Sequence, residues 1–407
     1  MSDHQPPNHD QGSPWEVLRV FGRLGLSSFG GPIAHLAYFR EELVQRRGWI
    51  SEERYANLLA LCQFLPGPAS SQLGFCLGLF RAGWLGAFAA FAAFTLPSVL
   101  LLVCFAMLAP QLSGGGAAAA IHGLKLVALA VVAHGVLGMS KKLCPDPLRA
   151  SLAVATCALV LLIPGALIQL ACVAGAGLIG SIACRSPAAG GQLPNPPLSP
   201  RSGALLIAIA LGLLALLPLL TLALGGGWAL FDAFYRSGAL VFGGGHVVLP
   251  WLEEAVVQPG WVDADTFLAG YGAAQAVPGP LFSFAAYLGF VSSGPLGGLS
   301  GALLATLAIF APGFLLVAGV LPFWSRLSAL PRATNAVSGV SAAVVGLLGA
   351  ALYQPLWTSA VGHAHDLVIA LVAFLLIASW RCSALWAVAW CMAASWAAWA
   401  LNLYPPS

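Results

Sequence analysis

Long uninterrupted runs of apolar residues recur along almost the entire chain. Several are close to the length of about 20 residues that a helix needs to cross the hydrocarbon core of a bilayer. They lack the alternation of apolar and polar positions that is typical of a transmembrane barrel strand. The pattern therefore predicts an all-α polytopic membrane protein with about 10–13 membrane segments. The clearest runs occupy residues 85–108, 117–139, 151–170, 203–224, 303–321, 333–352 and 366–380.

Composition agrees with a bilayer environment. Of the 407 residues, 59% are hydrophobic and 8% are charged, and the mean hydropathy is +0.88. About a quarter of the residues of a soluble protein are charged, so the surface of this chain is suited to lipid rather than to water. The net charge of +3 gives no reason to expect a nucleic-acid partner. The first fourteen residues are polar and contain no Lys or Arg, so we expect no cleaved signal peptide.

Two sets of short motifs occur in the same order in each half of the chain. The first half contains Phe29-Gly30-Gly31-Pro32, and the second contains Phe242-Gly243-Gly244-Gly245. A Gly-Trp pair follows in both halves, and then a Gln-x-x-Pro-Gly-Pro motif, at residues 63–68 and 275–280. Matched order and similar spacing indicate a tandem duplication.

The duplication predicts a domain organisation. We expect a polar tail (1–14), a first repeat (15–184), a Pro/Gly-rich linker (185–202), a connecting transmembrane helix (203–224), a second repeat (225–402) and a C-terminal tail (403–407). The connecting helix has no counterpart in the first half and would invert the second repeat. The loop after the first Phe-Gly-Gly motif contains several arginines, whereas its counterpart carries acidic residues without Lys or Arg, which suits opposite sides of the membrane. The fold class is thus two inverted repeats with broken or re-entrant helices.

The Pro-Gly-Pro motifs are the main candidates for a binding site. Proline ends one helix and is well tolerated at the start of the next, so each motif is expected to expose a helix N-terminus inside the membrane. Unpaired N–H groups at such an end attract anions, and glycine lets a ligand approach the backbone. The candidate substrate-binding residues are Gly30, Gly31, Gln63, Pro66, Gly67, Pro68, Ser70 and Ser71 in the first repeat, and Gly243, Gly244, Gly245, Gln275, Pro278, Gly279, Pro280 and Ser283 in the second.

The charges inside apolar segments also favour an anion. Arg23 and Arg236 occupy equivalent repeat positions, and Lys125 lies within a predicted span. Ionisable groups at membrane depth tend to be functional, although arginines that extend to the interface are the alternative. His246 directly follows the second glycine run and joins the candidates. His35, His122 and His134 are considered with it as a proton relay, with ordinary packing as the alternative.

Other classes of function receive no support from the sequence. The nine cysteines form no Cys-x-x-Cys and no Cys/His pairing at metal-ligand spacing, so no metal site and no cofactor are expected. No His-Glu-x-x-His and no Ser/His/Asp arrangement points to an enzyme. A scaffold or sensor would have little reason to keep two copies of a broken-helix motif.

The paired Phe-Gly-Gly, Gly-Trp and Gln-x-x-Pro-Gly-Pro motifs resemble the chromate ion transporter family in its long-chain, two-domain form. The resemblance covers residues 15–401, and the segment 275–289 matches especially closely. It implies export of chromate from the cytoplasm by secondary active transport, chromate resistance, and sulfate as a competitor. The residues alone indicate only a small anion, so sulfate or another oxyanion stays open as the substrate, and so does a homodimer. Pro32 stands where the second copy has Gly245, so the two turns are not expected to contribute equally.

Overall fold

The computed structural model describes residues 12–111, 114–163, 165–185, 197–242 and 245–403, and these ranges contain helices and no strand. The N-terminal tail, most of the predicted linker, Gly243, Gly244 and residues 404–407 lie outside them. The first half of the chain contains α1 (Pro14–Ser27), α2 (Gly31–Phe39), the π-helix η1 (Arg40–Arg46), α3 (Glu52–Phe64), α4 (Ala69–Leu108), η2 (Ala109–Gln111), α5 (Gly115–Leu143), α6 (Pro147–Leu162) and α7 (Ala166–Ala183).

The second half begins after the connecting helix α8 (Pro200–Leu224). Its helices are α9 (Gly227–Ala239), η3 (Gly245–Val247), α10 (Val248–Val256), α11 (Ala264–Ala276), η4 (Leu281–Ser283), α12 (Phe284–Val291), α13 (Gly298–Val320), η5 (Leu321–Phe323), α14 (Trp324–Leu327), α15 (Pro331–Ala351), η6 (Leu352–Trp357), α16 (Thr358–Ala360), α17 (Ala364–Ala378) and α18 (Ala384–Ala400).

Five helices of the described residues are long and apolar enough to cross a membrane. They are formed by α4 with η2, by α5, by α8, by α13 to α14, and by α15 to α16. Shorter apolar helices of 10–17 residues include α6, α17 and α18. The prediction of a polytopic helical membrane protein is therefore confirmed.

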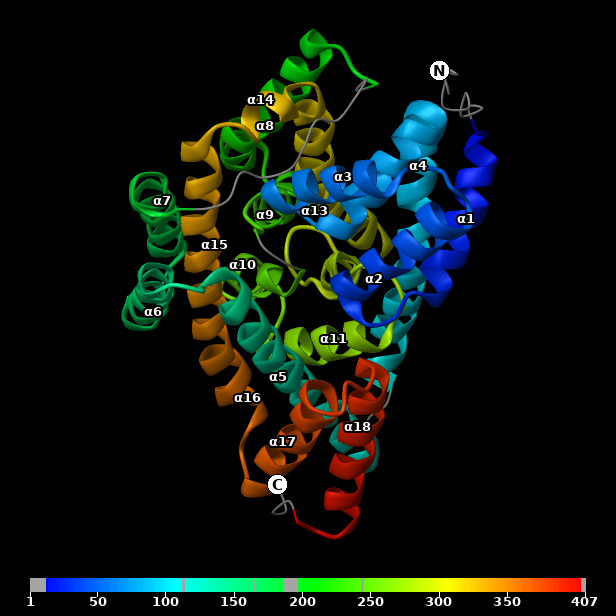
Figure 1. Cartoon of the computed structure of the whole chain (residues 1–407). Helices are drawn as coiled ribbons and strands as arrows, with labels where there is room; N and C mark the ends of the chain where they lie inside the picture. Colours follow the sequence, from blue (N-terminus) through cyan, green and yellow to red (C-terminus); the bar gives the residue numbers. More distant parts are fainter. Residues whose placement is uncertain (1–11, 112–113, 164, 186–196, 243–244, 404–407) are drawn as a thin grey trace.

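The two halves repeat the same series of helices. By position relative to the shared motifs, α1 corresponds to α9, α3 to α11, α4 to α12 plus α13, and α5 to α15. In the first repeat the backbone of Ala82 and Gly83 leaves the helical conformation and bends α4, and in the second repeat the helix is interrupted between α12 and α13. In Figure 1, α4 descends from the top of the molecule after its bend, while α13 leads up to α14 at the top. Likewise α5 rises and α15 descends, so the repeats are inverted.

Local sequence explains where the equivalent helices α3 and α11 begin. The Ser51 hydroxyl accepts the N–H of Arg54 at 3.3 Å, and the Asp263 carboxylate accepts the N–H of Thr266 at 2.8 Å. Ser and Asp are strong N-cap residues because a side-chain oxygen satisfies an N–H that has no partner within the helix. Both helices therefore start three to four residues after the Gly-Trp pairs, in a register that the sequence sets.

Each repeat packs its last two helices on the other repeat. The pair α17 and α18 packs on α5, and the pair α6 and α7 packs on α15. Glycine permits these approaches, since a Cβ at Gly339 of α15 would collide with the backbone of Ala176 in α7, and one at Gly123 of α5 would lie 2.6 Å from the Cys391 carbonyl of α18. Small residues at such crossings are typical of helix packing in membranes. The repeats are thus interleaved.

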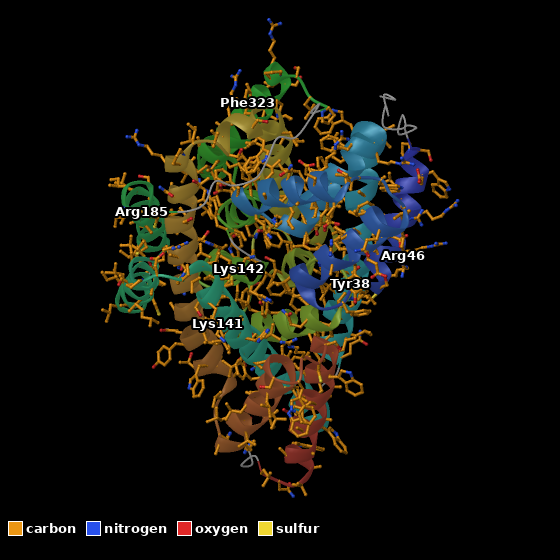
Figure 2. The ribbon with its side chains drawn as sticks, viewed as in Figure 1. Tyr38, Arg46, Lys141, Lys142, Arg185 and Phe323 are labelled. Atoms are coloured by element: carbon orange, nitrogen blue, oxygen red, sulfur yellow. The ribbon has the colours of Figure 1, made fainter. Side chains whose placement is uncertain are left out.

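The helix α8 lies at the edge of this arrangement. It packs on α9 and α13, and its leucines, such as Leu222, remain largely exposed. The basic side chains of Arg46, Lys141, Lys142 and Arg185 are exposed at helix ends (Figure 2). An apolar exposed face on a peripheral helix is suited to contact with lipid.

Candidate anion-binding site at the repeat interface

The Pro-Gly-Pro motifs break the helices as the sequence predicts. In the first repeat α3 ends at Phe64 and α4 starts at Ala69, and in the second α11 ends at Ala276 and η4 starts at Leu281. Gly67 and Gly279 have φ angles of +122° and +104°, which side chains other than that of glycine rarely allow. Each motif is therefore a tight loop that leads into the first turn of a new helix.

Backbone hydrogen bonds join each Pro-Gly-Pro loop to the opposite repeat. The N–H of Gly67 donates to the Val241 carbonyl at 2.7 Å, and the N–H of Gly279 donates to the Ser28 carbonyl at 3.0 Å. Val241 and Ser28 stand directly before the phenylalanines of the two Phe-Gly-Gly motifs. The four motifs thus form one pseudo-symmetric unit at the interface between the repeats.

Both loops lie against long helices near a proline. A Cβ at Gly67 would approach the Cα of Gly313, which follows Pro312 in α13, to 3.0 Å. A Cβ at Gly279 would approach the hydroxyl of Ser98, which follows Pro97 in α4, to 3.0 Å. These prolines stand well inside both helices, so the loops lie at about half the depth of the bundle. Binding sites of inverted-repeat transporters are found at this level.

Gln72 connects the first loop to the second repeat. Its fully buried amide donates to the Pro66 carbonyl at 2.9 Å and to the Gly313 carbonyl at 3.0 Å. The sequence analysis missed this residue, although a glutamine in the first turn after a Pro-Gly-Pro motif is a signal that could have revealed it. The second repeat has Phe284 at the equivalent position, so this contact has no counterpart there.

Serines near the loops differ in their capacity to bind an anion. The Ser98 hydroxyl donates to the Thr95 carbonyl at 2.8 Å and lies 2.5 Å from the Ser283 hydroxyl. Because Ser98 has used its proton, Ser283 is the donor in this pair, and it has no proton left for a ligand. Ser70 lies 3.5 Å from Nδ1 of His35.

His35 organises the first repeat around the Ser28 carbonyl. That carbonyl accepts the N–H of Gly279 and lies 3.2 Å from Nε2 of His35. A carbonyl oxygen only accepts hydrogen bonds, so Nε2 carries the proton and Nδ1 faces Ser70 as an acceptor. The fully buried His35 thus contacts both Ser70, which follows the first Pro-Gly-Pro motif, and the Ser28 carbonyl, which accepts the Gly279 N–H of the second motif.

Several buried polar atoms around the loops have no hydrogen-bond partner among the described residues. They are the hydroxyls of Ser28, Ser71 and Thr95, the amide nitrogen of Gln275 and the amide oxygen of Gln72. Ser71 and Gln275 flank the two loops, the Ser28 carbonyl accepts the Gly279 N–H, and Thr95 follows Phe94, whose carbonyl faces Gly279. Leaving a buried donor unsatisfied costs about 1–3 kcal/mol, so the three hydroxyls and the Gln275 amide favour a ligand that accepts hydrogen bonds, whereas the Gln72 oxygen can only accept one. An oxyanion offers such acceptors.

The remaining motif residues differ in their backbone conformation and burial. Gly30 and Gly31 have positive φ angles of +100° and +77°, and Pro68, Pro278, Pro280 and Gly245 are buried. Pro66 supplies the carbonyl that Gln72 binds. Gln63 is exposed, unlike its half-buried counterpart Gln275. Gly243 and Gly244 lie outside the described residues.

The basic candidates are not brought to the loops by any contact in the structure. Arg23 is exposed on α1. Arg236 forms an ion pair with Asp232 at 2.6 Å and donates to the Leu214 carbonyl of α8 at 3.3 Å. Lys125 forms an ion pair with Asp265 at 2.5 Å. The two arginines thus lie at the periphery, where pairing and exposure accommodate their charge.

Lys125 lines a cavity of about 700 Å³ between the repeats. The wall also includes His122, Asp263, Asp265 and Tyr287. Tyr287 stands one helical turn after Ser283, so the cavity approaches the second Pro-Gly-Pro segment along α12. The cavity is lined by apolar side chains together with these polar ones, and none of the Pro-Gly-Pro residues is part of its wall.

His246 contacts α11. Its Nδ1 is 2.8 Å from the hydroxyl of Tyr271, which stands one turn before Gln275 on α11. Tyr271 is fully buried and was not identified from the sequence, because a tyrosine among apolar helix residues gives no distinctive signal. His246 and Gln275 are therefore connected through α11.

An all-helical membrane protein with inverted repeats, broken helices and a polar unit at the repeat interface has the architecture of a membrane transport protein. The family description "Chromate transporter" matches residues 15–181 and again residues 228–396. The chain belongs to this chromate transporter family.

Curated relatives extend over most of the chain. A probable chromate transport protein of Synechococcus elongatus is 30% identical over 370 residues, which cover 90% of each chain. A chromate transport protein of Pseudomonas aeruginosa is 30% identical over 82% of this chain and 79% of its own length. One from Cupriavidus metallidurans is 27% identical over 83% and 81%. No solved structure matches the chain significantly.

Proposed function

We propose that this protein exports chromate from the cytoplasm across the cell inner membrane as a secondary active transporter, and so confers chromate resistance. Its membership in the chromate transporter family and the names of its relatives support chromate as the substrate. Sulfate, a tetrahedral dianion of similar size, is the competitor and the alternative substrate. The export direction and the coupling to an ion gradient are elements of the proposal that the experiment below tests.

The observation that carries the proposal is the motif unit at the repeat interface. Helices begin at Ala69 and Leu281, directly after the two loops, beside buried donors that have no partner among the described residues. Oriented N–H groups and hydroxyls favour an oxyanion and offer little to a cation. The substrate-binding role is assigned to this unit, with Ser71 and Gln275 as side-chain donors and Gly67 and Gly279 as the residues that shape it.

The inverted arrangement also supports a transport mechanism. In such proteins one repeat rocks against the other around a central site, so that the site opens to each side in turn. The cavity lined by Lys125 is an opening on one face of the repeat interface. Lys125 pairs with Asp265 in this cavity and so offsets part of the negative charge of Asp263 and Asp265, which would otherwise repel an anion.

The test uses inside-out membrane vesicles from cells that express the full chain, with radiolabelled chromate outside. Export in the cell corresponds to uptake by these vesicles. The proposal predicts uptake above that of vesicles without the protein, lost when an uncoupler collapses the proton gradient, and reduced by excess sulfate. A coupling to another ion would be identified by the same measurement with that ion's gradient imposed.

Two results would contradict the proposal in different ways. If the vesicles take up labelled sulfate but not chromate, the proposed substrate is wrong, while the proposal of an anion transporter stands. Uptake of neither anion, in vesicles with verified protein content, would refute the assignment of the motif unit as an oxyanion site.

A further inference from the structure

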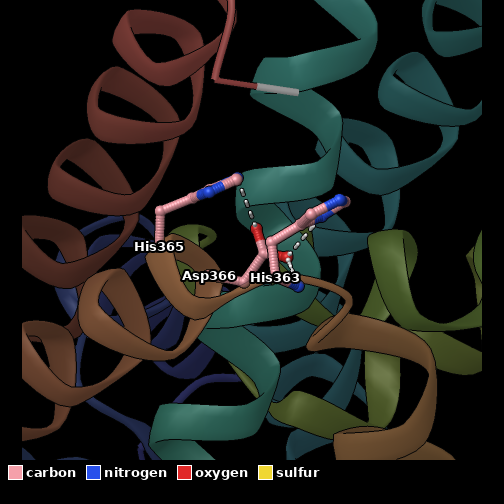
Figure 3. Close-up of side chains that lie close together, drawn as sticks. All are labelled: His363, His365 and Asp366. Carbon is pink, nitrogen blue, oxygen red and sulfur yellow. Dashed lines mark hydrogen bonds and ion pairs between the residues drawn. The ribbon is translucent and has the colours of Figure 1, made fainter. Parts of the chain in front are cut away.

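A cluster of histidines and one aspartate lies away from the motif unit, at the start of α17. The sequence His363-Ala364-His365-Asp366 forms the turn into this helix. Asp366 is 1% exposed, although a lone carboxylate is among the groups least suited to burial in a membrane protein. Figure 3 shows its carboxylate between the side chains of His363 and His365.

The donor atoms are close enough to share one ion. Nδ1 of His363 lies 3.7 Å from one oxygen of Asp366, and Nε2 of His365 lies 3.7 Å from the other. One donor atom from each of the three residues falls within 4.8 Å of the other two. Tetrahedral zinc with bonds of about 2.1 Å separates its ligand atoms by about 3.4 Å. To bind it, His363 has to release the Asp366 N–H that its side chain accepts, and the two imidazoles, now stacked with ring centroids 5.0 Å apart, have to turn toward the ion.

The surroundings hold the carboxylate in a fixed orientation. Nε2 of His122, on α5, lies 3.0 Å from Oδ1 of Asp366, and the N–H groups of Gly362 and His363 donate to Oδ2 at 3.1 and 2.9 Å. Carboxylates that bind a metal ion regularly accept hydrogen bonds from neighbouring groups that fix their orientation. The arrangement therefore provides ligands together with the residues that orient them.

The cluster is also accessible. A cavity of about 350 Å³ is lined by His122, His363 and Asp366 together with residues of α5, α16 and α18. The side chain of His363 is 41% exposed and that of His365 is 21% exposed. An ion can thus reach the three donors, and a water molecule can occupy its fourth position.

We propose that His363, His365 and Asp366 bind one divalent transition-metal ion, with Zn²⁺ as the best match. Two imidazoles and a carboxylate form a ligand set that zinc accepts, and that the hard cation Mg²⁺ does not prefer. The competing explanation is an ion-pair network in which protonated imidazoles neutralise Asp366 and the carboxylate caps α17. This inference is independent of the transported substrate. The sequence analysis missed the cluster because it searched for cysteine pairs and longer motifs.

The experiment measures metal binding to the full chain, purified in detergent without a polyhistidine tag and stripped with a chelator. Equilibrium dialysis is expected to give about one equivalent of Zn²⁺ that excess Mg²⁺ does not displace. Co²⁺ should give the visible absorption bands of a tetrahedral complex. The His365→Phe variant keeps a flat ring of similar size and should lose the bound equivalent and these bands. Asp366→Asn keeps an acceptor for the helix cap and should lose them too. His122→Gln should weaken binding about 10–100-fold.

A matched control addresses the histidines of the N-terminal tail. The His4→Ala/His9→Ala variant should bind metal as the unaltered chain does, because these residues lie far along the sequence from the cluster. The proposal is overturned if the unaltered chain binds less than a tenth of an equivalent. It is also overturned if His365→Phe and Asp366→Asn, each verified as folded by its melting temperature, retain the bound ion, or if the tail variant alone loses it.

Discussion

Replacing Gly279 with alanine tests whether the shape of the Pro-Gly-Pro loops is needed for transport. At a φ of +104° an alanine would be strained by about 1–3 kcal/mol. Its Cβ would also lie 3.0 Å from the Ser98 hydroxyl and 3.2 Å from the Phe94 carbonyl, and overpacking of this kind costs about 1–3 kcal/mol. The loop relieves this strain by moving away from α4, which disrupts the hydrogen bond from Gly279 to Ser28.

The expected result is a loss of transport that exceeds the loss of stability. If about 2 kcal/mol of the strain falls on the binding-competent arrangement, transport decreases roughly 30-fold, since each 1.4 kcal/mol is a factor of ten. Initial rates of chromate uptake are measured in inside-out vesicles at matched protein content, and insertion is verified by the amount in the membrane fraction. The melting temperature in detergent reports on the fold.

The matched control is Gly212→Ala. Gly212 lies on the exposed face of α8, its φ angle is not in the left-handed region, and no atom lies within 4 Å of a Cβ placed there. This variant should transport as the unaltered chain does. Uptake by Gly279→Ala equal to that of the control would refute the reasoning, because it would mean that the loop tolerates a side chain and does not shape the site.

Five further substitutions distinguish the roles of other residues. Gln72→Leu should lower the melting temperature by several degrees and reduce uptake, because two buried carbonyls lose their donor at about 1–3 kcal/mol each. Lys125→Met leaves the carboxylates of Asp263 and Asp265 without its charge and should raise the chromate concentration needed for half-maximal uptake, with Lys125→Arg close to the unaltered chain. Equal concentration dependence in both variants would contradict this role of Lys125. Arg236→Ala should lower the melting temperature, because it leaves the half-buried Asp232 without its ion-pair partner. Arg23→Ala, on the exposed surface of α1, should change neither stability nor uptake.

Sequence reasoning succeeded where a residue type has one structural consequence. Proline cannot continue a helix, so the breaks before Ala69 and Leu281 follow directly from Pro66-Gly67-Pro68 and Pro278-Gly279-Pro280. Uninterrupted apolar runs predict helices in lipid, and the difference in loop charge between the halves predicted the inversion that the helix directions confirm.

Sequence reasoning failed where a role depends on what a side chain meets across the interface. Arg23 and Arg236 were selected for their charge and their equivalent positions, and their substrate-binding role stays a prediction, since Arg23 is exposed and Arg236 contacts Asp232 and Leu214. Gln72 and Ser98 were overlooked because their partners are more than 180 residues away in the chain. Nothing in the apolar sequences of α5 and α15 indicates that each receives the last helices of the other repeat.

The exchange of contacts between the repeats has a consequence for how the protein is made. The first half is synthesised before the second, yet the partner of the Gly67 N–H is the Val241 carbonyl, and α5 packs on α17 and α18. During translation the first half therefore enters the bilayer before the ribosome has synthesised the segments that these groups contact. Each half acts as a scaffold for the other, so the nascent protein passes through a vulnerable stage in which membrane insertion runs ahead of tertiary folding.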